Sequence, residues 1–187
     1  TLRSSVAALV EHVAGTKAAL ERFGLAAGAK SKSTGNILDK LARIAGQPPA
    51  NNLKVALPDW LSDPEAHRRA CEHDLAVYQQ VLALAGQFSD RRDAAKVDLL
   101  RTLAGRHTML VAFDSRPISL ALLRQRLAEA DPELNVIVAT GEQQAARREV
   151  TEHLRPGAAT GKLIALCSDA MSEGVNLQAA AAVVHLD

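Results

Sequence analysis

Residues 162–187 read KLIALCSDAMSEGVNLQAAAAVVHLD, and this segment decides the fold. Two short apolar runs, 162–167 and 182–186, flank a loop of polar and small residues. Short, continuous apolar runs are typical of strands that are buried on both faces of a parallel sheet. The segment therefore predicts two strands, with hydroxyl, carboxylate, amide and glycine groups in the loop at the carboxyl end of the first.

Two further runs of the same kind, 108–113 (TMLVAF) and 134–139 (LNVIVA), lie upstream, and a helical pattern follows each of them. Ser115 is a candidate N-cap for the first helix, with Pro117 in the first turn, where proline is tolerated. Alternating strands and helices favour a parallel sheet with helices on both faces. We therefore expect an α/β fold whose ligands bind at the carboxyl ends of the strands.

The first half of the chain differs, because its apolar residues recur at helical spacing and loops rich in glycine and proline separate them. We divide the chain into a mostly helical segment, 1–93, and an α/β domain, 94–187. Since the chain begins at Thr1 and stops directly after a strand-like run, we expect it to belong to a longer protein.

The composition is that of an ordinary soluble protein, with 187 residues, a net charge of +1 and 48% hydrophobic residues. Two cysteines, Cys71 and Cys167, are too few for a disulfide scaffold, so we expect a cytoplasmic location. No apolar run approaches the roughly 18 residues that span a bilayer, so we expect no membrane partner. The near-zero net charge argues against binding of polyanions over the whole surface, but a local basic strip remains compatible with it.

Two stretches resemble ligand-binding motifs but lack part of the required pattern. Residues 157–162 (GAATGK) resemble a phosphate loop, but only three residues separate the two glycines and Leu163 replaces the Ser or Thr that would hold magnesium. His67, Cys71 and His73 could place two metal ligands on one helical face, but zinc takes three or four. We interpret the first stretch as a turn and the second as core and surface positions.

The polar loop carries a resemblance to a known family. Residues 168–178 (SDAMSEGVNLQ) resemble motif V of superfamily 2 helicases, in particular of their Swi/Snf-type branch. Upstream, 109–127 looks like motif IV, and 139–147 is similar to the glycine loop of this family and the helix start that follows it. Lys96, with the leucines after it, fits the helix that opens the second lobe. Together these motifs cover about residues 94–187.

The resemblance implies a RecA-like fold and the second motor lobe of an ATP-dependent nucleic-acid translocase or helicase, with duplex DNA as the favoured partner. The first RecA-like lobe of the same protein would be the other partner. ATP and Mg²⁺ would bind the intact parent and not this fragment, which would contain no catalytic residue and no metal ligand. The phosphate backbone would contact Ser115, Arg116, Thr140, Gly141 and Ser168. The loop that couples this contact to ATP would comprise Asp169, Glu173, Gly174, Asn176 and Gln178.

The chain also departs from the family pattern. Met171 and Ser172 stand where many members have glycine, and Asp114 stands beside Arg116 in the turn after the first strand. A carboxylate at this point predicts weaker attraction of the turn for phosphate.

Two other functions remain open. The chain could be a non-catalytic, helicase-like scaffold whose helical half binds protein, since a fold does not entail an activity. It could also be an unrelated nucleotide-binding α/β domain, but it lacks the glycine fingerprint after the first strand that such domains carry. Sequence beyond both ends would distinguish the first of these from a motor.

Overall fold

The structure is a computed structural model that describes residues 4–26, 35–141, 144–158, 161–172 and 177–187. The chain forms two compact units. The sheet unit comprises residues 1–9, 20–31 and 89–187, and the helical unit comprises residues 10–19 and 32–88. The boundary that the sequence suggested, between residues 93 and 94, falls inside helix α6 (Arg91–Arg106).

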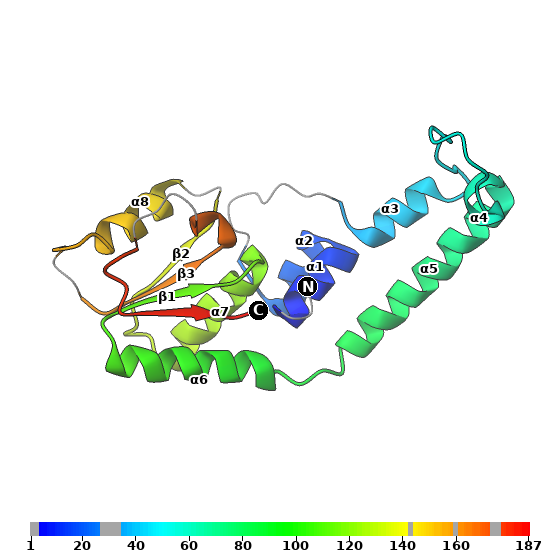
Figure 1. The fold of residues 1–187 in the computed structure, drawn as a ribbon. Coiled ribbons are helices and arrows are strands. Elements are labelled where there is room, and N and C mark those ends of the chain that lie inside the picture. Colours follow the sequence, from blue (N-terminus) through cyan, green and yellow to red (C-terminus); the bar gives the residue numbers. More distant parts are fainter. Residues whose placement is uncertain (1–3, 27–34, 142–143, 159–160, 173–176) are drawn as a thin grey trace. The chain divides into compact units, whose positions relative to one another are not determined.

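The sheet unit is built on four parallel strands in the order β2-β3-β1-β4 (Figure 1). These strands are β1 (Met109–Phe113), β2 (Val136–Ala139), β3 (Leu163–Cys167) and β4 (Ala182–His185). Phe113 pairs with both Cys167 and His185, and Ala139 pairs with Cys167. The last residues of all four strands therefore lie in register, and the loops that follow them emerge at one carboxyl edge.

Helices cover both faces of this sheet, as predicted. Helices α6 and α7 (Pro117–Ala130) lie on one face, and α8 (Gln144–His153) lies on the other (Figure 1). Every residue of β1 and β3 is buried, because side chains that alternate along a strand enter the two helix-covered layers in turn. The α/β fold with an all-parallel sheet is thus confirmed, and its architecture is consistent with a RecA-like domain.

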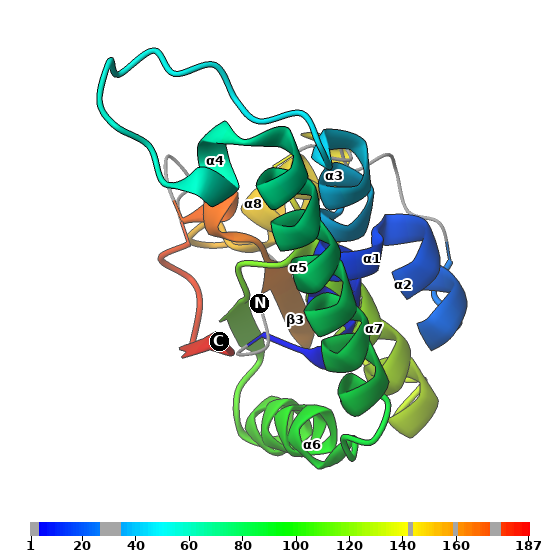
Figure 2. The ribbon, with the colours of Figure 1, turned by 90° about the vertical axis from the view of Figure 1, so that its right-hand side faces the viewer.

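The described part of residues 1–88 contains helices and no strand. They are α1 (Val6–Ala14), α2 (Thr16–Phe23), α3 (Ile37–Ile44), α4 (Asp59–Ser62) and α5 (Pro64–Ala85). Helices α3 and α4 pack against α5 (Figure 2). The start of α5 is fixed by Asp63, whose carboxylate accepts a hydrogen bond from the Ala66 N–H at 2.6 Å, and by Pro64 in the first turn. Among the helices of the described residues, none combines the length and the apolarity that crossing a bilayer requires.

Candidate nucleic-acid interface

The carboxyl edge of the sheet brings together the three turns that the sequence assigns to phosphate contact. Ser115 and Arg116 follow β1, Thr140 and Gly141 follow β2, and Ser168 follows β3. Because β3 lies between β2 and β1 in the sheet, the three turns are immediate neighbours. Residues far apart in the sequence therefore share one edge.

Backbone hydrogen bonds extend the sheet ladder into these turns. The Asp114 N–H donates to the Cys167 carbonyl at 3.1 Å, and the Ser168 N–H donates to the Ala139 carbonyl at 3.0 Å. The first residue after β1 and the first after β3 are thus hydrogen-bonded in the same way as strand residues. This places the start of each turn independently of any ligand.

Gly141 lies in close contact with the turn after β3. A Cβ atom added at Gly141 would lie 2.9 Å from the Cβ of Ala170, closer than real Cβ atoms approach one another. Ala170 belongs to a single turn of 3-10 helix, η1 (Asp169–Met171). The absence of a side chain at Gly141 therefore allows the turns after β2 and β3 to touch.

The turn after β1 is organised by Asp114. Its side chain is fully buried, Oδ1 accepts a hydrogen bond from the Arg116 N–H at 2.9 Å, and Oδ2 lies 3.5 Å from the Lys96 ammonium. Burial lowers the pKa of Lys96, and the charge of Asp114 opposes that shift. The carboxylate that the sequence placed beside Arg116 thus faces Lys96 on α6 and not the solvent.

Ser115 and Arg116 are accessible, but Ser115 is already bonded. A hydrogen bond from its hydroxyl lowers the pKa of the Asp187 carboxyl, which follows β4. The proposal that Ser115 caps α7 is wrong, because the helix begins at Pro117 with Arg116 at the N-cap position and no side-chain cap. An N-cap one residue later leaves the Ser115 hydroxyl free to bridge the ends of β1 and β4.

Ser168 is less accessible than a phosphate contact would require. Its side chain is buried, and its hydroxyl oxygen has no hydrogen-bond partner. The Ser168 carbonyl accepts a hydrogen bond from the Met171 N–H at 2.8 Å, which forms η1. In this arrangement the hydroxyl does not lie on the surface that a nucleic-acid strand would meet.

The predicted coupling loop is only partly described. Asp169 begins η1, and its carbonyl accepts a hydrogen bond from the Ser172 hydroxyl at 2.6 Å. Gln178 lies exposed after this loop. The other three predicted members, Glu173, Gly174 and Asn176, lie outside the described residues.

Metal-ligand geometry is not found in the described ranges, where no three His, Cys, Asp or Glu side chains gather in a suitable group. On α5, the Cys71 sulfur lies 3.9 Å from His67 Nδ1, and both side chains are buried. Two ligands do not make a zinc site.

Sequence reasoning missed the residues that support the turn after β1. The sequence pattern assigns Lys96 only to a helix, and it assigns no partner to Ser4 or Ser5. Ser5 does cap α1, since its hydroxyl accepts a hydrogen bond from the Ala8 N–H at 3.0 Å. The available signal was the spacing of Lys96, which lies four residues before Leu100 and so shares the apolar face of α6, where a cation requires a buried partner.

Comparison of the chain with family models, with curated proteins and with solved structures gives no match. The resemblance to helicase motifs therefore stays a prediction. The geometry of the carboxyl edge is the observation on which a functional proposal can be built.

Proposed function

We propose that this chain is the second RecA-like lobe of a Swi/Snf-like, ATP-dependent DNA translocase, and that the carboxyl edge of its sheet contacts the phosphate backbone. One observation carries the proposal: three turns that resemble phosphate-contacting motifs follow three adjacent strands and meet at one edge.

The accessible groups at this edge suit phosphate oxygens. Arg116 offers a guanidinium group, Thr140 a hydroxyl, and Gly141 an exposed backbone. Contacts to phosphate carry no sequence information, so binding should be salt-sensitive and tolerant of sequence. Ser168 would join them only if its turn moves on binding.

In the complete protein, ATP with Mg²⁺ would supply the free energy for cyclic closure of the two lobes. The residues described here would hold the DNA backbone and release it as the lobes close and open. The chain alone should bind DNA without hydrolysing ATP, because the proposal assigns the ATP-binding lysine and the magnesium ligands to the first lobe.

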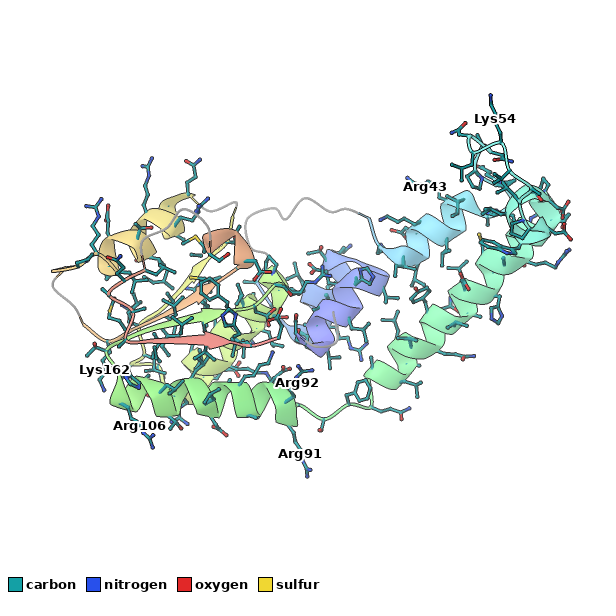
Figure 3. All side chains as sticks on the ribbon, viewed as in Figure 1. Arg43, Lys54, Arg91, Arg92, Arg106 and Lys162 are labelled. Carbon is teal, nitrogen blue, oxygen red and sulfur yellow. The ribbon has the colours of Figure 1, made fainter. Side chains whose placement is uncertain are left out.

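The location of the DNA site can be tested with two arginines of the same unit. Arg116→Ala should weaken binding of two duplexes of unrelated sequence by a similar factor, about threefold to tenfold, because one phosphate contact is lost. Arg106→Ala is the matched control, since Arg106 ends α6 next to the amino end of β1 and projects away from the sheet (Figure 3). Fluorescence anisotropy with labelled duplexes measures both. Equal weakening by the two variants, or loss of affinity for only one duplex, would contradict the proposal.

A second candidate, a protein-interaction module, is favoured by one observation on the helical unit. Large apolar side chains there are exposed: Trp60 by 54%, Leu84 by 57% and Phe88 by 55%. Trp and Phe are enriched in the cores of protein interfaces. If the chain is a protein-interaction module, it should bind no duplex DNA even at low salt.

A further inference from the structure

A buried polar network links the first described residues of the chain to the turn after β1. Its centre is the Lys96 ammonium, which donates a hydrogen bond to the Ser4 carbonyl at 2.5 Å and lies 3.5 Å from Asp114 Oδ2. The Lys96 side chain is 10% exposed and that of Asp114 is not exposed at all. Lys96 therefore joins residues 4–5 to the end of β1.

Two pairs of hydroxyl groups complete the network. Ser5 and Ser119 share a buried hydrogen bond of 2.7 Å, and Ser4 and Ser115 share a longer one of 3.3 Å. Ser119 lies in the first turn of α7, and Ser115 lies in the turn before it. Residues 4–5 thus contact both ends of the short segment that contains Arg116.

The energetics of this network centre on the ion pair. Asp114 Oδ2 has no hydrogen-bond partner, so the charge of Lys96 is the compensation that the structure gives it. Removal of one partner from a buried ion pair leaves an uncompensated charge, which is strongly destabilising. The carboxylate would escape this cost by turning toward water, and Oδ1 would then release the Arg116 N–H.

We propose that Lys96 is a positioning residue for the phosphate-contacting turn: with the Ser4 carbonyl it fixes Asp114, which in turn fixes the backbone of Arg116. The expected effect of Lys96 on DNA affinity rests on the proposed function, whereas its effect on the backbone of Arg116 does not. Arg91 and Arg106 on the same helix differ from Lys96 in this respect, since they project away from the sheet (Figure 3). Lys96 is thus a basic residue of α6 that lies in the interior of the site and not on its surface.

The local effect can be measured without DNA, as hydrogen exchange of individual backbone amides by NMR. Lys96→Met should raise the exchange rate of the Arg116 amide by about tenfold or more relative to the Val111 amide in β1, because only the turn loses its acceptor. The double variant Lys96→Met/Asp114→Asn should restore protection, since the neutral amide keeps an oxygen for Arg116 and leaves no buried charge. Arg106→Met is the matched control and should leave both amides unchanged.

Affinity for a labelled duplex provides the second measurement. Lys96→Met should weaken binding by about as much as Arg116→Ala, about threefold to tenfold, and the double variant should recover most of it. If the Arg116 amide responds as expected but the wild-type chain binds no DNA, the positioning role stands and the proposed function fails. If exchange at Arg116 rises only in parallel with Val111, or does not rise, the positioning role is overturned.

If Lys96→Met does not fold, the double variant is informative by itself. A folded double variant with a protected Arg116 amide supports the coupling of the two residues through charge. A folded double variant with an unprotected Arg116 amide overturns it, because the lysine would then act through something other than the charge of Asp114.

Discussion

Ser115 ties the ends of two strands together through one hydroxyl group. Its hydrogen bond to Asp187 is the main cause that lowers the pKa of that carboxyl. The charged Asp187 carboxylate therefore stabilises the folded state at pH values above the ordinary pKa of an aspartate. This contribution is lost as the pH falls through the lowered pKa of Asp187. A phosphate that binds Ser115 must compete with this carboxylate or share the hydroxyl with it.

Ser115→Ala should raise the pKa of Asp187 toward its ordinary value, because the hydrogen bond that favours the charged form is removed. The measurement is an NMR titration of the Asp187 carboxyl. Ser62→Ala, at an exposed position of α4, serves as the control and should leave this pKa unchanged. An unchanged pKa of Asp187 in Ser115→Ala would show that the hydroxyl does not hold the carboxylate.

At the scale of residues, the sequence predicts which polar groups follow each strand but not where their side chains point. Ser168 and Asp114 both follow a strand, yet both are buried, since each first residue after the strand remains in the hydrogen-bond ladder. The direction of Asp114 depends on Lys96, and no local pattern reports a contact between two separate elements. Arg116 and Gly141, which lie further into their turns, are accessible as expected.

The contact between the turns after β2 and β3 sets their spacing. Gly141→Ala should destabilise the fold by about 1–3 kcal/mol, because the new methyl group would overlap Ala170 and force the two turns apart. Gly105→Ala is the matched control, since nothing lies within 4 Å of a Cβ there and alanine favours the helix, so this variant should gain up to about 1 kcal/mol. Urea denaturation measures both. Effects of the same sign would contradict the close contact.

At the scale of elements, short apolar runs predicted the strands well. The run 108–113 corresponds to β1 and the run 162–167 to β3, each within one residue, because a strand buried on both faces must be apolar throughout. The start of α7 was less predictable. A serine suited to capping stands at position 115, but the turn is closed by Asp114 instead, and the helix begins at Pro117.

At the scale of the whole molecule, the order of the strands and the place of residues 4–9 in the sheet unit were not predicted. Both depend on contacts between distant segments, such as those of Ser4 and Ser5 with Lys96, Ser115 and Ser119. The four strands and their common carboxyl edge follow from local patterns. The order of the strands does not, nor does the exposed face of β4, where Val183 is 54% exposed. The candidate interface depends on that order.

The most direct test of the account is the affinity of the 187-residue chain for duplex DNA across a range of salt concentrations. If the carboxyl edge holds the phosphate backbone, the logarithm of the association constant should fall linearly with the logarithm of the salt concentration, with a loss of about tenfold or more between 50 and 200 mM. Two duplexes of unrelated sequence should give the same line. No binding at the lowest salt concentration, or an affinity that salt leaves unchanged, would contradict a backbone contact at this edge.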